Sequence, residues 1–347
     1  MKKIIFNCPY IHGPGAIKWI VASWEEGFRL KGYEFHVCQD DRTLEAMWER
    51  IRPQILYCDI VATRIEDSAI RAFLQKARAS GTKVCMSIFW PLVTQAELRA
   101  DALRRHDVAD LYCGEREPDS MGSFELECGK KYMTLPQSAS PRFHFPTAPA
   151  AKYAYDVVYL GAKLPHKRWF NDNVIGPLRR KYKVGLFGPN WTARDNSLRA
   201  VSKLTRMAGL PALARSFDRF RIYIPEEDEN KLYSSAKIAL NFHEREPDHS
   251  QPHYLVNQRT YKIAACGGFQ IVDPVAALSK YFAPDEIVTA GFDARDWLDK
   301  VAYYLSHDAE RKAIQERATA RALREHMAHH RVALLESWLF PARPAKA

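Results

Sequence analysis

The sequence predicts an α/β protein with two domains, each built on a doubly wound, Rossmann-like parallel sheet. Short apolar runs alternate with helix-like patterns in the first half of the chain, and the same alternation restarts near Tyr155. The stretch 141–151 between the two halves is rich in Pro and Ala and has little periodicity, as a linker would. A chain of 347 residues is long enough to form two separate cores.

The first half opens with an apolar strand at 3–8 and a helix over about 16–30 whose apolar residues recur at i, i+4 spacing. Further elements follow in alternation: strands near 35–38, 55–60, 83–89 and 110–113, and a helix over 70–79. We therefore expect residues 1–150 to form the first domain.

The second half repeats this pattern, and we expect its domain to span residues 151–325. Its expected strands lie near 156–160, 183–187, 236–242, 269–272 and 286–289, and its last expected helices cover about 293–306 and 308–338.

Composition places the chain among globular proteins, because 47% of its residues are hydrophobic and 27% are charged. The apolar run at the start ends at Asn7, too early for an export signal, and no 18-residue apolar span follows. We therefore expect a cytoplasmic protein without a transmembrane segment. None of the seven cysteines forms a C-x-x-C pair, which favours reduced core thiols over disulfides or zinc ligands.

The net charge of +10 is concentrated in one region. Residues 161–221 contain 14 Lys or Arg and only three acidic residues, which indicates a polyanionic partner. Within this region, the stretch from about 191 to 221 combines Arg and Lys with Leu and Phe in an amphipathic pattern. Such helices bind phosphate backbones or anionic membrane surfaces, or only keep a protein soluble.

The most informative segment is a helix that begins at the N-cap Asn257 and ends at the glycine pair 267–268. Arg259 and Lys262 are three residues apart and share one face of its first turn, with Thr260 beside them. A helix N-terminus flanked by two cations favours a phosphate or pyrophosphate. The alternative is an ordinary αβ unit with a solvated charged face.

Several motifs occur in an order that resembles the GT-B glycosyltransferases, and most closely the group related to the spore-maturation protein CgeB. They are Leu-Asn-Phe-His at 240–243, Asn-Gln-Arg-Thr-Tyr-Lys-Ile-Ala-Ala-Cys-Gly-Gly-Phe at 257–269, Tyr-Asp-Val-Val-Tyr-Leu-Gly at 155–161, Leu-Phe-Gly-Pro-Asn-Trp at 186–191 and Arg-Glu-His at 324–326. The resemblance covers about residues 155–340 well and the first 150 in outline. More distantly, chain length, basicity and layout resemble phage enzymes that glycosylate hydroxymethylated bases of DNA.

This resemblance implies two Rossmann-like domains that face each other across a cleft. The first domain would serve the acceptor, the second would bind a nucleotide sugar, and residues 326–347 would cross back toward the first domain. The implied reaction moves a sugar from a nucleotide-diphosphate sugar to an acceptor hydroxyl and requires no cofactor. A UDP-sugar is the first choice of donor. Where the family usually has Glu for the ribose hydroxyls, this chain has Lys262, and an ammonium only donates hydrogen bonds. Either Lys262 lies on a phosphate or donor binding is lost.

Candidate site residues fall where parallel strands end, since ligands of such sheets bind at that edge. Fixed cations at a helix N-terminus stabilise a leaving diphosphate without a metal, and no Asp-x-Asp follows a strand; residues 226–229 indicate a solvated turn or a helix start. The candidates for binding the donor are Gly13, Gly15, Lys167, Arg168, Gly188, Trp191, Tyr223, Asn241, Asn257, Arg259, Thr260 and Lys262. The candidates for catalysis are Glu115, Asp59 and His243.

The acceptor stays open at this point. DNA or another polyanion would bind through 161–221, whereas the other candidates are a small or lipid-linked saccharide and a protein. Two other classes compete: a sugar-nucleotide 2-epimerase, which needs carboxylates in the cleft, and a non-catalytic nucleic-acid-binding relative.

Overall fold

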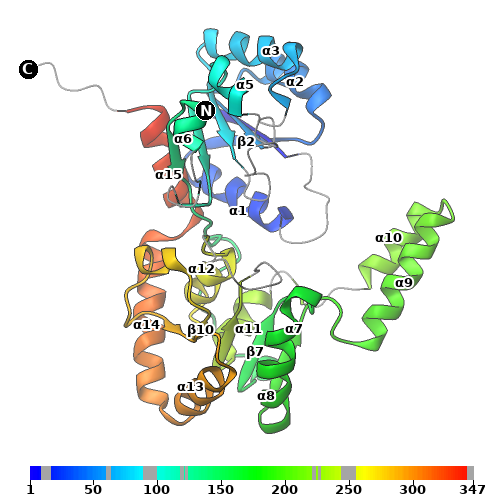
Figure 1. Cartoon of the computed structure of the whole chain (residues 1–347), viewed down its shortest axis with the longest axis vertical. Coiled ribbons are helices and arrows are strands. Elements are labelled where there is room, and N and C mark those ends of the chain that lie inside the picture. Colours follow the sequence, from blue (N-terminus) through cyan, green and yellow to red (C-terminus); the bar gives the residue numbers. More distant parts are fainter. Residues whose placement is uncertain are drawn as a thin grey trace, which may run out of the picture. The chain divides into compact units, whose positions relative to one another are not determined.

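In the computed structural model of the chain, two compact units are formed (Figure 1). Unit 1 comprises Met1–Arg142 with His326–Ala347, and unit 2 comprises Phe143–Glu325. The structure describes residues 1–8, 17–59, 64–88, 100–117, 121, 124–220, 224–225, 228–243 and 255–341.

Unit 1 contains a six-stranded sheet in the order β2-β1-β3-β4-β5-β6, and every pairing in it is parallel. The order reverses between β1 and β3, which is a topological switch point. The strands are β1 Lys2–Asn7, β2 Tyr33–Cys38, β3 Ile55–Asp59, β4 Lys83–Ser87, β5 Leu111–Gly114 and β6 Tyr132–Thr134.

Helices cover both faces of this sheet, so neighbouring strand residues enter different cores. Ile5 packs in one core with Trp48, whereas Ile4 packs in the other with Phe28. Because both faces are buried, the inner strands β4 and β5 are buried along nearly all of their length, whereas the edge strand β2 alternates apolar residues with Glu34 and His36. The helices are α1 Ile17–Leu30, α2 Leu44–Ile51, α3 Ser68–Ala79, α5 Ala100–Arg105, α6 Phe124–Cys128 and α15 Ala328–Leu339.

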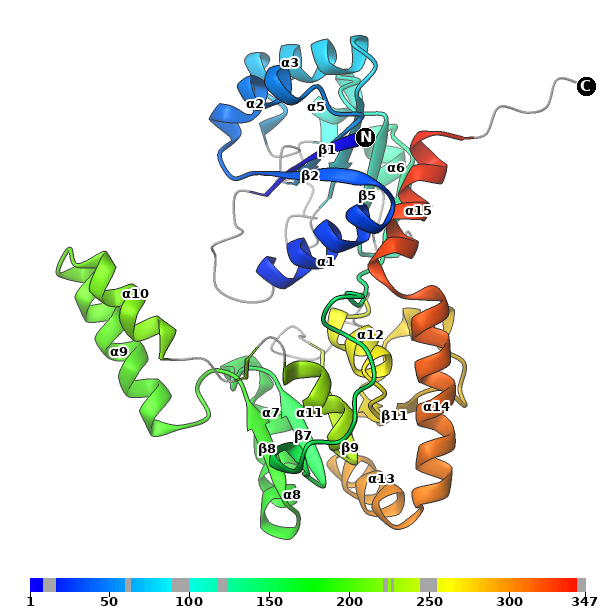
Figure 2. The ribbon, with the colours of Figure 1, turned by 180° about the vertical axis from the view of Figure 1, so that it is seen from behind.

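The chain's last helix returns to unit 1, where α15 packs beside α1 (Figure 2). The approach is close: a Cβ added at Gly27 would lie 2.8 Å from the carbonyl carbon of Ala328. One uninterrupted helix over 308–338 was expected, and this is wrong. The helix ends at Glu325, because Met327 forms a parallel bridge with Ala139 before α15 begins.

Unit 2 contains a five-stranded parallel sheet in the order β11-β10-β9-β7-β8, with its switch point between β7 and β9. Its core is aromatic: Phe170 stacks on Phe242 with ring centroids 4.4 Å apart, and Trp297 packs edge-on against Phe170. The strands are β7 Val157–Leu160, β8 Val184–Phe187, β9 Ile238–Asn241, β10 Gln270–Val272 and β11 Val288–Thr289.

The main helices of unit 2 are α7 Arg168–Phe170, α8 Gly176–Lys181, α11 Glu229–Ser235, α12 Gln258–Ala265, α13 Ala294–Ser306 and α14 Asp308–Glu325. Two further helices, α9 Ala193–Met207 and α10 Pro211–Arg219, pair with each other and stand away from the sheet in both views (Figures 1 and 2). We call residues 193–219 the basic hairpin.

Within the described residues, no helix is both long and apolar enough to cross a bilayer. All seven cysteines, which lie in the described part of the chain, are buried and form no disulfide there.

Candidate active site

The N-terminus of α12 begins next to the switch point of unit 2. Asn241 ends β9, and its Nδ2 donates to Thr260 Oγ1 at 2.8 Å while its Oδ1 accepts from Asn257 Nδ2 at 2.9 Å. Asn257 caps the helix, as predicted, by accepting the amide of Thr260 at 3.1 Å. The end of the strand and the start of the helix are therefore fixed to each other.

Arg259 places a cation at this helix N-terminus. Its NH1 donates to Asn241 Oδ1 at 3.2 Å, and its guanidinium lies 5.4 Å from the ring centroid of Tyr159 on β7. The side chain is only partly buried. A partly exposed guanidinium beside the positive end of a helix is suited to bind a phosphate.

Lys167 and Arg168 are neighbours with different surroundings. Lys167 is buried, and its Nζ lies 3.4 Å from the hydroxyl of Tyr159, the ring on which Arg259 lies. The Arg168 side chain is 85% exposed and pairs with Asp172 one helical turn away. Of these two predicted residues, only Lys167 joins the group around Tyr159.

The loop after β8 closes the other side of Tyr159. Trp191 Nε1 donates to the carbonyl of Gly161 at 2.7 Å, and its ring meets Tyr159 edge-on at 6.0 Å. Gly188 has φ +136°, and an added Cβ would lie 2.4 Å from the carbonyl oxygen of Gly161. Only glycine fits there, so this loop reaches the end of β7 through Gly188. The third residue predicted for this side, Tyr223, lies outside the described residues.

Lys262 is engaged by a carboxylate from α11. Its Nζ lies 2.6 Å from Glu229 Oε1, both side chains are nearly buried, and His144 Nε2 lies 3.8 Å from the same carboxylate. Burial alone raises the pKa of Glu229, but the charge of Lys262 and the contact with His144 outweigh it and lower that pKa to about 2. The ammonium of Lys262 is therefore matched by a charge inside unit 2.

Glu229 was missed by the sequence analysis. Of the two alternatives for 226–229, a solvated turn or a helix start, the helix start is confirmed: α11 begins at Glu229, and both Asp228 and Glu229 are buried. Asp228 pairs with Lys152 and Lys231, which satisfies its charge. The signal available in the sequence was the pair Leu232 and Tyr233, which follow this acidic run and are buried.

His243 is fully buried and both of its ring nitrogens are engaged. Asn257 donates its amide to Nε2 at 3.1 Å, and Nδ1 lies 2.7 Å from Asp273 Oδ1. Because a backbone amide only donates, Nε2 accepts and the proton is on Nδ1, directed at Asp273. We infer that His243 positions the cap of α12; its predicted catalytic role stays a prediction.

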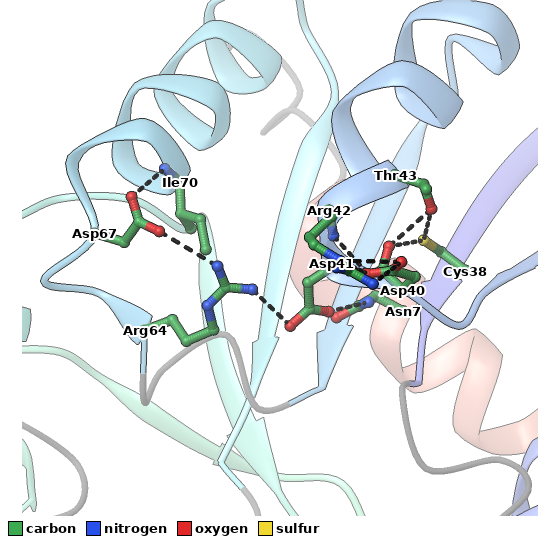
Figure 3. A network of polar contacts seen from close by, with 9 residues as sticks. All are labelled: Asn7, Cys38, Asp40, Asp41, Arg42, Thr43, Arg64, Asp67 and Ile70. Atoms are coloured by element: carbon green, nitrogen blue, oxygen red, sulfur yellow. Dashed lines mark hydrogen bonds and ion pairs between the residues drawn. The ribbon is translucent and has the colours of Figure 1, made fainter.

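A second polar group lies at the switch point of unit 1 (Figure 3). Asn7 ends β1 and is fully buried; its Nδ2 donates to Asp41 Oδ1 at 2.8 Å, and Arg64 holds the other Asp41 oxygen at 3.0 Å. Within the described part of the chain, Asn7 Oδ1 has no hydrogen-bond partner. Asn7 was expected only as the end of an apolar run, although a polar residue at a strand end was the signal.

The two predicted carboxylates end different strands of unit 1. Asp59 ends β3, next to β1 at the switch point, and its side chain lies outside the described part of the structure. Glu115 follows β5, two strands further along the sheet, and accepts from Gln137 Nε2 at 2.7 Å. Gly13 and Gly15, predicted after β1, lie outside the described residues.

Residues 168–337, which include α12 and its cap, match the family model described as "Glycosyl transferase-like". Sucrose-phosphate synthase from Thermosynechococcus elongatus superposes with a TM-score of 0.62 at 11% identity, over 99% of this chain and 100% of that chain. HepE of Anabaena, solved with UDP-glucose, superposes with a TM-score of 0.59 at 10% identity, over 97% of this chain and 100% of that chain. A glycosyltransferase from Rickettsia africae ESF-5 superposes with a TM-score of 0.61 at 9% identity, over 98% of this chain and 99% of that chain. No curated protein sequence matches the chain significantly.

These likenesses, together with the two parallel sheets, confirm the predicted fold class.

Proposed function

We propose that this chain, which has the GT-B fold and matches a glycosyltransferase family model over residues 168–337, moves a sugar from a UDP-sugar to an acceptor hydroxyl, with the diphosphate bound at the start of α12. The observation that carries this is the placement of Arg259 on Asn241 and Tyr159 at a helix N-terminus. The choice of UDP is supported by HepE, which was solved with UDP-glucose and shares this fold.

The chemistry requires that negative charge developing on the leaving diphosphate be stabilised. Arg259 and the amides at the start of α12 supply fixed positive charge, and Lys167 adds a second cation beside Tyr159. Because these groups are held by Asn241 and Tyr159 before the donor arrives, little reorganisation is needed. We propose that this arrangement makes transfer independent of a metal.

Lys262 has a different part in this proposal. Its pairing with Glu229 ties α12 to α11, so it fixes the helix whose N-terminus binds the diphosphate. The predicted contact of Lys262 with a phosphate stays a prediction, as does the narrower relationship to the CgeB group.

We further propose that unit 1 binds the acceptor at its own switch point. Asn7 Oδ1 accepts no hydrogen bond from the residues that the structure describes, and we assign to it a hydrogen bond from the acceptor hydroxyl. Asp59 on the neighbouring strand is the better placed of the two predicted bases. Hydroxymethylated DNA, the alternative acceptor, presents the same hydroxyl chemistry and is tested by the same assay.

The test begins with a thermal-shift screen of UDP, ADP and GDP, in which UDP should raise the melting temperature most. Release of UDP from UDP-glucose is then followed in the wild type, Arg259→Ala and Arg168→Ala, without added metal and with chelator. We expect Arg259→Ala to lose activity while Arg168→Ala, whose side chain faces solvent, keeps it. Equal activities of the two variants would refute the assigned site, and loss of wild-type turnover in chelator would refute metal independence.

A further inference from the structure

The basic hairpin exposes an apolar surface on the side of α9 that faces away from α10. Leu204 is 63% exposed, Met207 is 75% exposed, and Val201 lies one turn before Leu204. The opposite side of α9 packs on α10, where Ser202 and Ala214 are buried. At 100° per residue, the three exposed side chains form one continuous stripe.

Two further large apolar side chains are exposed near the turn of the hairpin. Leu210, in the turn between the helices, is 51% exposed, and Leu213 on α10 is 46% exposed. Soluble proteins rarely expose so many large apolar side chains within one short hairpin unless something binds there.

Cations border this apolar stripe. Arg199 and Lys203 are one turn apart on the same flank of α9, and both are exposed. The two acidic residues of the hairpin are used internally, since Asp195 accepts the amide of Asn190 and Asp218 pairs with Arg206. The hairpin contains six basic residues in all, namely Arg194, Arg199, Lys203, Arg206, Arg215 and Arg219.

We infer that the basic hairpin docks on the surface of an anionic phospholipid bilayer. In this arrangement, Leu204, Met207 and Leu210 enter the boundary between headgroups and acyl chains, and Arg199 and Lys203 lie among the lipid phosphates. Duplex DNA would match the cations but would leave the apolar stripe in water, so the combination favours lipid over nucleic acid. The proposal concerns a surface that no step of the proposed sugar transfer uses.

The experiment is co-sedimentation of the full chain with phosphatidylcholine vesicles, with and without phosphatidylglycerol. We expect wild-type binding only to the vesicles that contain phosphatidylglycerol. Leu204→Asp/Met207→Asp should weaken it at least ten-fold, because two apolar side chains are lost from the bilayer. Arg199→Gln/Lys203→Gln should weaken it roughly 25-fold, since one cation near such a surface contributes about five-fold. A matched control is Leu126→Asp, which alters a side chain 80% exposed on α6 and should bind as the wild type does.

UDP affinity is measured on the same variants and should be unchanged, which shows that they are folded and separates this proposal from that for the donor site. Retention of vesicle binding by Leu204→Asp/Met207→Asp would overturn the inference. The inference would also be overturned if the wild type did not bind vesicles but shifted duplex DNA in a mobility assay. In that case Leu204→Asp/Met207→Asp would keep the DNA shift and Arg199→Gln/Lys203→Gln would lose it.

Discussion

Replacing Lys262 by Met tests whether the buried pair with Glu229 holds α12 in place. The substitution keeps the side-chain length and removes the ammonium that lies 2.6 Å from Glu229 Oε1. Glu229 would remain buried without its counter-charge, and removing one partner of a buried ion pair costs about 3–5 kcal/mol. For a unit of this size, each kcal/mol lowers the melting temperature by about 2–4 °C. We therefore expect a decrease of roughly 6–20 °C.

Thermal unfolding followed by circular dichroism measures this loss, with two comparisons. Lys300→Met removes a partly exposed partner of Asp296 and should cost less than about 1 kcal/mol. The double variant Lys262→Met/Glu229→Gln should recover most of the loss, because no buried charge is then left alone. If Lys262→Met melts like Lys300→Met, the pair does not hold α12 and the reasoning is refuted.

Three further outcomes follow from the same contacts. Gly188→Ala should abolish folding or UDP binding, because its added Cβ would lie 2.4 Å from a carbonyl oxygen. The control Gly209→Ala places its Cβ within 4 Å of no atom and should lower the free energy of unfolding by only about 1 kcal/mol. Urea denaturation distinguishes the two variants. Burial lowers the pKa of His144, and the paired ammonium lowers that of Glu229 to about 2 despite burial, so the unfolded chain binds more protons in acid. The free energy of unfolding should fall as pH drops below about 6.5, and again from about 4.5 toward 2, and a pH-independent value would contradict this. His243→Ala should weaken UDP binding several-fold by loosening the cap of α12, yet leave the pH profile of kcat unchanged; a lost pH limb would instead support its predicted catalytic role.

The alternation of apolar strands and helices was sufficient to predict both parallel sheets. It is a local pattern, and buried parallel strands leave a clear mark in sequence. The cap at Asn257 was predicted for the same reason, since capping depends on residues three apart. The break at Met327 was not predicted, because its bridge partner Ala139 is distant in the chain.

Charge pairing at the site also depended on distant contacts. Nothing near Lys262 in the sequence indicates that Glu229 reaches it. The position of Tyr159 likewise decides that Lys167 is buried beside it, whereas Arg168 is exposed and pairs with Asp172. Residue type predicted which groups could bind a phosphate, but only the fold determines which of them meet.

The most direct test of the central claim compares the affinities of UDP and uridine for the wild type and Arg259→Ala by isothermal titration calorimetry. One charge at about 4 Å contributes up to roughly 4 kcal/mol near a protein surface, and a charge-assisted hydrogen bond about 1.5–3 kcal/mol. We predict that Arg259→Ala weakens UDP binding at least ten-fold and leaves uridine binding unchanged. An equal loss for both ligands, or no loss for either, would contradict a diphosphate held at the start of α12.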